Sequence, residues 1–224
     1  MTETRPRTRT FHPRRGRMSP GRKLILAELS PRFALVPTGD PIDQRAVFAR
    51  VAPLVVEIGF GMGEATAERA AAEPDLDVLA LDIHTPGVAH LMRLLATQGS
   101  TNVRVIEEDA LDVLPLLVPP GSLAALRISF PDPWPKVRQQ HRRLVNARTI
   151  VGFTDLLAPG GRLELVTDCD DYADQMLAAI AGEPRLVNLH GGRASRPPER
   201  PVTKFERRAL AEGRVVADII AHRS

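Results

Sequence analysis

The sequence predicts an α/β fold built on a mainly parallel sheet with helices on both faces. Short runs rich in Val, Ile and Leu alternate with helical segments along most of the 224 residues. A glycine-rich turn joins the first of these runs to the helix that follows it. Strands that alternate with helices of this length are joined by crossovers, which place helices on both faces of a parallel sheet. The length suits one such domain.

The first half of the chain supplies three strands. Ser19 and Pro20 favour a helix start, since Ser is a good N-cap and Pro fits the first helical position. Thr85 and Pro86 repeat this signal. The expected elements are a helix from Ser19 through residue 30, strands at 54–59, 77–83 and 103–106, and helices at 64–72 and 85–98.

The second half of the chain supplies the remaining strands. Pro159, Gly160 and Gly161 end a helical segment, because neither residue type continues a helix. The expected elements are helices at 109–117, 140–157 and 170–180, and strands at 123–129, 162–166, 185–189 and 215–220. The last strand is expected to be antiparallel, and it completes a sheet of seven strands.

Composition narrows the class of protein. Hydrophobic residues make up 43% and charged residues 25% of the chain, as is ordinary for a globular protein. No run is long and apolar enough to span a membrane or to form a signal peptide, so a cytoplasmic location is expected. Cys169 is the only cysteine, which excludes an internal disulfide and a cysteine-based zinc cluster. We expect no required metal, and the sequence does not indicate an oligomeric state.

The basic residues are segregated along the chain. Residues 1–23 hold eight Arg or Lys against one Glu, and residues 136–148 hold five against no acid. Residues 185–208 hold seven against two. Clusters of this kind are typical of proteins that bind a polyanion, although a solvated basic surface would look the same. We expect residues 1–18 to be a mobile basic arm and residues 19–224 to form a single domain.

The most informative segment is Phe-Pro-Asp-Pro-Trp-Pro-Lys at residues 130–136, followed by a cationic run. The prolines stiffen the loop that carries Asp132 and Trp134. A carboxylate held beside an aromatic face suits recognition of a flat polar group such as a nucleobase. The structural alternative is a proline-rich turn with a capping Asp and a buried Trp.

A second group of residues marks the ends of the first three strands. Gly59 and Gly61 sit where the first strand meets its helix and allow a ligand to approach the backbone. Glu57 stands two residues before Gly59, Asp82 ends the second strand, and Asp109 ends the third. A carboxylate after the second strand can accept both hydroxyls of a ribose, and Asp109 could reach an adenine amino group. Each acid alone could be a solvated strand-end residue.

Two nucleotide cofactors compete for this pocket. A nicotinamide dinucleotide usually meets a G-x-G-x-x-G motif, and Glu57 would repel its pyrophosphate. S-adenosylmethionine has no phosphate and carries an ammonium and a sulfonium. An acid-rich pocket therefore favours S-adenosylmethionine.

Taken together, these segments resemble the bacterial tRNA (guanine-N7-)-methyltransferases, which are of the class I, Rossmann-like type. The matching segments are residues 11–18, 56–63, 84–88, 130–143, 167–168 and 203–206. The Phe-Pro-Asp-Pro-Trp-Pro-Lys and Thr-Lys-Phe-Glu segments, in this order, are the specific ones. The resemblance implies methyl transfer from S-adenosylmethionine to N7 of the variable-loop guanosine, position 46, of tRNA.

The resemblance also implies a role for individual residues. Asp132 would be catalytic and would contact the cofactor together with Glu57, Gly59, Gly61, Asp82 and Asp109. The implied tRNA contacts are Lys136, Asp168, Thr203, Lys204, Phe205 and Glu206, with an RNA-interacting segment of Arg138, Gln139, Gln140, His141, Arg142 and Arg143. Two departures are visible: the family often has Glu in place of Asp82, and its segment after Lys136 is usually more basic.

Several of these residues also have structural interpretations. Thr203 and Glu206 form a capping box for a helix through Leu210, and Asp168 could cap the helix beginning near Asp170. Trp134 could stack on the target base or brace its loop.

The sequence leaves the chemistry of the loop open. Guanine N7 has an in-plane lone pair and no proton, so methyl transfer to it needs no general base. Asp132 could stabilise the guanine as it becomes cationic, or accept hydrogen bonds from it. Two other functions compete: methylation of an exocyclic amine, whose usual Asp/Asn-Pro-Pro-aromatic motif resembles this loop, and tRNA binding without turnover.

Overall fold

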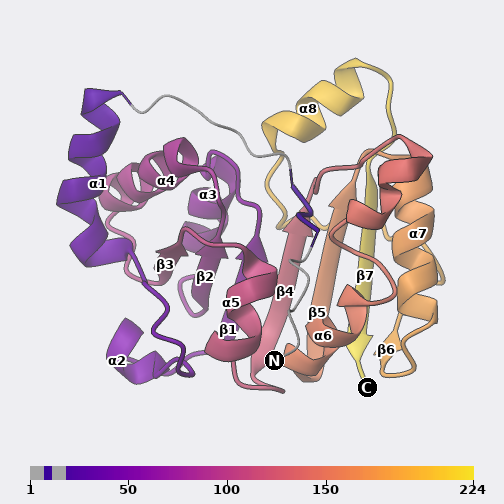
Figure 1. The fold of residues 1–224 in the computed structure, drawn as a ribbon, viewed down its shortest axis with the longest axis horizontal. Helices are drawn as coiled ribbons and strands as arrows, with labels where there is room; N and C mark the ends of the chain where they lie inside the picture. Colours follow the sequence, from indigo (N-terminus) through magenta and orange to yellow (C-terminus); the bar gives the residue numbers. More distant parts are fainter. Residues whose placement is uncertain (1–7, 12–18) are drawn as a thin grey trace, which may run out of the picture.

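The computed structural model describes residues 8–11 and 19–224, and it confirms the predicted α/β architecture (Figure 1). One sheet has the strand order β3-β2-β1-β4-β5-β7-β6. The first five strands are parallel, whereas β7 runs antiparallel to both β5 and β6. The strands are β1 (Leu54–Ile58), β2 (Asp77–Leu81), β3 (Val103–Ile106), β4 (Leu123–Ser129), β5 (Leu157–Thr167), β6 (Leu186–Val187) and β7 (Ala217–Arg223).

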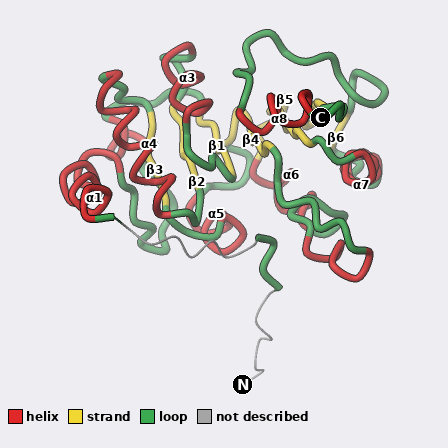
Figure 2. Tube along the Cα trace, turned by 90° about the horizontal axis from the view of Figure 1, so that it is seen from above, coloured by secondary structure: helices red, strands yellow, loops and turns green. Residues whose placement is uncertain are grey.

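Helices cover both faces of the sheet, as the view from above shows (Figure 2). One face carries α1 (Pro20–Phe33), α3 (Glu64–Ala72) and α4 (Thr85–Gln98). The other carries α5 (Ala110–Leu117), α6 (Thr149–Leu156) and α7 (Asp170–Ala181). The remaining helices are α2 (Gln44–Phe48), the 3₁₀ helix η1 (Val137–Arg142) and α8 (Lys204–Ala211). Within the described residues, no helix is long and apolar enough to cross a membrane.

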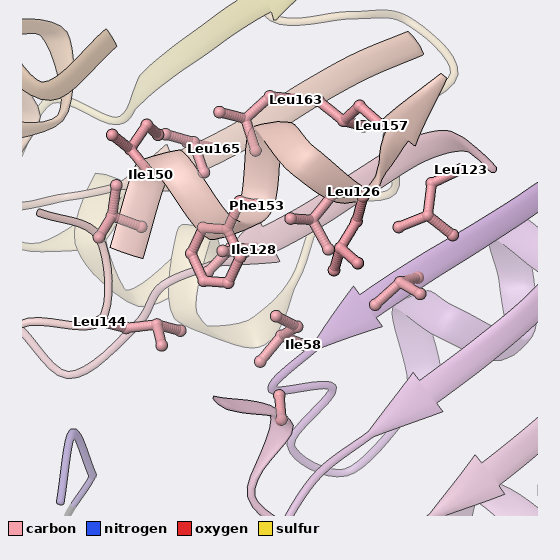
Figure 3. Close-up of a cluster of buried hydrophobic side chains, with 14 of the residues drawn as sticks. Ile58, Leu123, Leu126, Ile128, Leu144, Ile150, Phe153, Leu157, Leu163 and Leu165 are labelled. Atoms are coloured by element: carbon pink, nitrogen blue, oxygen red, sulfur yellow. The ribbon is translucent and has the colours of Figure 1, made fainter. Parts of the chain in front are cut away.

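The strands divide their side chains between two cores because alternate residues point to opposite faces. Val55 on β1 belongs to the core under α3 and α4. Val56 and Ile58 belong to the core under α5, α6 and α7. Figure 3 shows this second core, where Phe153 of α6 packs among leucines and isoleucines from β1, β4 and β5. A sheet buried on both faces has only its strand ends exposed, so these ends are where a ligand can reach it.

Most predicted elements are confirmed, and the differences have clear causes. The helix predicted at 140–157 is wrong in its first half, which is the η1 turn followed by coil. Asn146 Oδ1 accepts from Arg148 N and Thr149 N in a turn that leads into α6, so the helix begins only at Thr149. The strand predicted from Arg162 begins earlier, at Leu157, and the Pro-Gly-Gly segment forms a bulge within it. The helix α2 was not predicted. Its N-cap is Asp43, whose side chain accepts from Arg45 N.

Candidate active site

A cavity of about 330 Å³ opens at the carboxyl ends of β1, β2, β3 and β4. The segments that follow these four strands form most of its wall. Residues at the start of α8 also line the cavity. Figure 1 shows α8 over the ends of β4 and β5. Nine of the site residues predicted from the sequence line this one cavity: Glu57, Gly59, Gly61, Asp82, Asp109, Asp132, Thr203, Lys204 and Phe205.

The glycine loop after β1 is fixed in place by Asp82. One carboxylate oxygen of Asp82 accepts from Gly61 N at 2.7 Å and the other accepts from His84 N at 2.9 Å. Gly87 in α4 comes so close that a Cβ there would lie 1.8 Å from the Gly61 carbonyl oxygen. Asp82 therefore ties the loop to the start of α4, and each of its oxygens retains a second lone pair for a ligand.

Asp109 combines a structural contact with a place in the cavity. Its side chain caps α5 by accepting from Leu111 N at 3.1 Å. The cap holds the carboxylate at the end of β3, where it lines the cavity. Within the described residues, no cluster of three metal-ligating side chains is present.

Glu57 is the penultimate residue of β1 and lies on the α3 side of the sheet. Its backbone is in register with Arg127 on the neighbouring strand β4. Burial raises the pKa of Glu57 above its ordinary value, although the positive charge of Arg127 opposes this. The site thus contains a carboxyl group whose ionisation is sensitive to what binds beside it.

The loop after β4 has an unusual backbone at each end. Phe130 has φ of 51° and Trp134 has φ of 44°, a region that side chains other than glycine rarely occupy. Conformations of this kind cost on the order of 1–3 kcal/mol and persist where the surrounding structure holds them. Phe130 N donates to Val166 O at 2.8 Å, which anchors the first turn. The two turns and their prolines hold Asp132 at the cavity wall.

Trp134 braces this loop. Its ring is buried, and its Nε1 donates to the carbonyl oxygen of Thr10 at 3.0 Å. The guanidinium of Arg142 lies 3.7 Å from the centroid of the indole, and Arg142 Nε donates to Arg9 O. Of the two roles expected for Trp134, the structure favours the bracing one. It also brings residues 8–11 of the N-terminal arm against the loop, and the rest of residues 1–18 lies outside the described residues.

The predicted RNA-interacting segment divides into exposed and buried residues. Arg138 and His141 are exposed on η1, and Lys136 is exposed just before it, outside the cavity. Gln139 and Gln140 are half-buried, and Gln140 donates to Asp171 at 3.0 Å.

Arg143 was predicted to belong to the RNA-interacting segment, and the structure corrects this prediction. It is buried and donates to Pro133 O at 2.8 Å, to Gln175 at 2.9 Å and to Asp171 at 2.6 Å. These contacts make Arg143 a support of the loop rather than a surface cation.

The Thr-Lys-Phe-Glu segment begins α8, and the threonine half of the predicted capping box is present. Thr203 Oγ1 accepts from Glu206 N at 3.0 Å. Glu206 itself is buried, and both of its oxygens pair with Arg200, at 2.6 and 3.0 Å. Asp168 was expected to cap α7, but its side chain pairs with Arg214 instead and does not cap that helix. Glu206 and Asp168 therefore hold α8 and its following loop against the sheet.

Sequence reasoning missed several residues of the cavity. Phe130 stacks against Phe205, with ring centroids 6.1 Å apart and planes inclined by 28°. Arg127 lies at the inner wall, and Thr10 and Phe11 of the arm lie at the loop after β4. Arg127 sits within a strand run that reads as hydrophobic, so only the register with Glu57 reveals it.

Comparison with known proteins identifies the family. Residues 51–219 match a family model described as "Putative methyltransferase". A tRNA (guanine-N(7)-)-methyltransferase of Thiobacillus denitrificans is 46% identical over 98% of this chain and 96% of its own length. The chain belongs to this family. Another member, from Paraburkholderia xenovorans, is 44% identical over 96% of this chain and 83% of its own length.

Solved structures show the same fold as this tRNA (guanine-N7-)-methyltransferase family member at low sequence identity. The 16S rRNA methyltransferase KamB superposes with a TM-score of 0.61 at 15% identity, covering 86% of this chain and 99% of its own. A Streptococcus mutans protein in complex with SAH superposes with a TM-score of 0.52 at 13% identity, covering 93% and 100%. These likenesses support the class I methyltransferase fold.

Proposed function

We propose that this chain transfers a methyl group from S-adenosylmethionine to N7 of a guanosine in tRNA, the variable-loop guanosine at position 46. The observation that carries the proposal is that Asp132 lines the same cavity as Glu57, Asp82 and Asp109. The family membership supports it. A cytoplasmic location remains a prediction.

The donor set of the cavity fits S-adenosylmethionine. Carboxylates line the cavity, and two of them, Asp82 and Asp109, follow the ends of β2 and β3. A nucleoside would lie at these strand ends. Asp82 would accept from the ribose hydroxyls and Asp109 from the adenine amino group, while Glu57 would pair with the ammonium. When bound, S-adenosylmethionine supplies an electrophilic methyl group on a sulfonium.

Asp132 acts on the guanine. The N7 lone pair forms a bond to the methyl carbon as the bond from that carbon to sulfur breaks, and the sulfur keeps the electron pair. Positive charge therefore moves onto the guanine ring, and no proton has to be removed. The Asp132 carboxylate would stabilise this charge, because a group held by a stiff loop needs no reorganisation during the reaction. The support is its position beside the cofactor acids.

Phe130 and Phe205 would form the contact surface for the target base. Both rings line the cavity beside Asp132, and Phe205 is 37% exposed. Aromatic rings stack on bases and attract cations. An N7-methylated guanine is cationic, so these rings would stabilise the positive charge of the product as well as stack on the flat substrate base. Trp134, which is buried, is left with the bracing role.

Exposed cations near the cavity mouth would hold the tRNA backbone. Lys136 immediately precedes η1 and Arg138 is its second residue. Lys204 and Arg207 are exposed on α8. Lys204 and Arg207 also line the cavity. We propose these residues as phosphate ligands in place of Arg143. Thr203, Asp168 and Glu206 would act mainly by positioning α8.

The proposal is tested by methyl transfer to unmodified tRNA. The protein is incubated with transcript tRNA and methyl-labelled S-adenosylmethionine, and the digested nucleosides are separated. We expect label in 7-methylguanosine, and loss of this label when the position 46 guanosine is replaced. Label in an N-methylated adenosine or cytidine would support amine methylation instead. Binding of tRNA without transfer would indicate a non-catalytic protein.

Changing Phe205 to Ala should impair use of tRNA while leaving the cofactor site intact. Stacking of a base on an aromatic side chain is worth about 1–3 kcal/mol, so we expect kcat/KM for tRNA to fall by roughly tenfold or more. Affinity for S-adenosylhomocysteine should change little. The control is Leu210→Ala, which removes an exposed apolar side chain from the same helix. Equal effects of the two substitutions would contradict the stacking role.

Acidification should weaken cofactor binding earlier than an ordinary glutamate would allow. The pKa of Glu57 lies above the usual 4.5, so its carboxylate is lost as pH falls through that higher value. The ammonium then loses its partner, and calorimetry should show affinity for S-adenosylhomocysteine declining at a pH above 4.5. Glu57→Gln should bind more weakly throughout and lack this decline. A decline of equal size and position in Glu57→Gln would assign it to another group.

A further inference from the structure

A row of charged side chains crosses the sheet behind the cavity. Glu57 on β1, Arg127 on β4 and Glu164 on β5 are in register, so their side chains lie on the same face. Arg69 reaches this row from α3, which covers that face. Arg127 and Glu164 are each more than nine-tenths buried. Charges buried in this way are costly unless each is paired.

Arg69 has its hydrogen-bonding capacity largely committed within this row. Its Nε donates to Glu73 at 3.0 Å. Its two terminal nitrogens donate to Glu164 at 2.8 and 3.4 Å. Arg69 therefore acts as a fixed link between the two carboxylates.

Arg127 is less completely partnered than Arg69, although it also lines the cavity. Its Nη2 lies 2.9 Å from Glu73, and its Nε lies 3.6 Å from Glu164. Among the described residues, its Nε donates no hydrogen bond. A guanidinium has five N–H donors, and a buried one with unused donors at a cavity wall is suited to bind an anion.

We propose that Arg127 binds the carboxylate at the amino-acid end of S-adenosylmethionine, while Glu57, its neighbour across the strands, binds the ammonium. This inference rests on the proposed function, because it assumes that the cavity holds this cofactor. Adjacent, oppositely charged groups on β1 and β4 form a recognition site for a zwitterionic amino acid. The adenosine then extends along the strand ends toward Asp82 and Asp109.

The test pairs changes in the ligand with changes in the protein. The ligands are S-adenosylhomocysteine and 5′-deoxy-5′-(3-aminopropylthio)adenosine, which lacks only the carboxylate. Their dissociation constants are measured by calorimetry. A charge-assisted hydrogen bond is worth about 1.5–3 kcal/mol, so wild type should bind the carboxylate-free ligand at least about tenfold more weakly.

The decisive variant is Arg127→Gln. It should bind S-adenosylhomocysteine about tenfold more weakly than wild type does, and it should prefer that ligand to the carboxylate-free one by less than about threefold. The control is Arg162→Gln, which removes a guanidinium from the same carboxylate, 3.4 Å from Glu164, without touching the cavity. It should keep the wild-type preference. If Arg127→Gln does not fold, Arg127→Lys preserves the charge and should show a reduced preference.

Three results would overturn the inference in different ways. Equal affinity of wild type for the two ligands would show that the carboxylate is not recognised. A full preference retained in Arg127→Gln, or in Arg127→Lys where that variant replaces it, would assign the carboxylate to another residue. No binding of S-adenosylhomocysteine by wild type would overturn the proposed function as well, and this result is distinct from the other two.

Discussion

Changing Asp132 to Asn should slow single-turnover methyl transfer by about 10²-fold or more. The amide keeps the shape of the loop and removes only the charge that stabilises the developing guanine cation. Removing one preorganised electrostatic group from an active site typically costs a factor of about 10²–10³. Affinities for tRNA and for S-adenosylhomocysteine should change far less, because the effect is on the transition state. Rapid quench with saturating tRNA and labelled cofactor measures the rate.

The control for this experiment is Asp155→Asn. Asp155 is an exposed carboxylate at the far end of the sheet, where it pairs with Arg185. Its substitution should leave the rate unchanged. Since N7 carries no proton, raising the pH should not restore the rate of Asp132→Asn. A rate near that of wild type would make Asp132 a turn residue, and recovery at high pH would point to methylation of an amine.

The predictable part of the fold is the part that local sequence determines. The segments for β3, α3 and β4 were predicted with the bounds observed, because each is a hydrophobic run or helical pattern with its own punctuation. The segment 140–148 was predicted as α-helix and is not one, because its helical pattern yields to tertiary contacts. Arg143 turns inward to Asp171 and Gln175, which are distant in the sequence.

The residues of the site also divide into those that local sequence predicts and those that depend on tertiary contacts. Glu57, Asp82 and Asp109 could be predicted because parallel strands place their carboxyl ends at one edge. Phe130 faces Phe205 only because α8 is held over the ends of β4 and β5, and nothing in either local sequence indicates that contact. The motif that contains Glu206 predicts that this residue contacts tRNA. In the structure Glu206 is buried and pairs with Arg200, so its presence in the motif has a structural explanation.

Changing Arg200 to Met should destabilise the protein by about 3 kcal/mol or more. Arg200 is buried and pairs with both Glu206, at 2.6 Å, and Asp218 on β7, at 2.7 Å. Arg196 still reaches Glu206 at 3.0 Å, so the substitution leaves Asp218 as the uncompensated buried charge. Breaking a buried pair by removing one partner typically costs about 3–5 kcal/mol. Urea unfolding followed by circular dichroism measures the change.

The dependence of this loss on pH identifies its cause. In wild type, burial raises the pKa of Glu206, but its bonds to Arg200 outweigh burial and hold the pKa below its ordinary value. The pairing therefore stabilises the fold above the ordinary glutamate pKa and loses this effect as pH falls. Burial raises the pKa of Asp218 even beside Arg200, which opposes the shift. Without Arg200 this pKa should rise further, so protonation of Asp218 relieves the buried charge as pH falls. The stability gap between the variant and wild type should thus be widest near pH 7 and narrow toward pH 4.

A control substitution distinguishes the contribution of the buried Arg200 ion pairs to stability from that of a surface ion pair. Arg208→Met removes an arginine from α8, the helix that carries Glu206, where Arg208 is exposed and pairs with Glu212 four residues later. It should change stability little at any pH. Because Arg200 holds α8 to β7, Arg200→Met should also weaken the Phe130–Phe205 contact and lower kcat/KM for tRNA, as Phe205→Ala does. A destabilisation of equal size at pH 4 and pH 7 would show that packing, and not the buried ion pairs, is what Arg200 contributes.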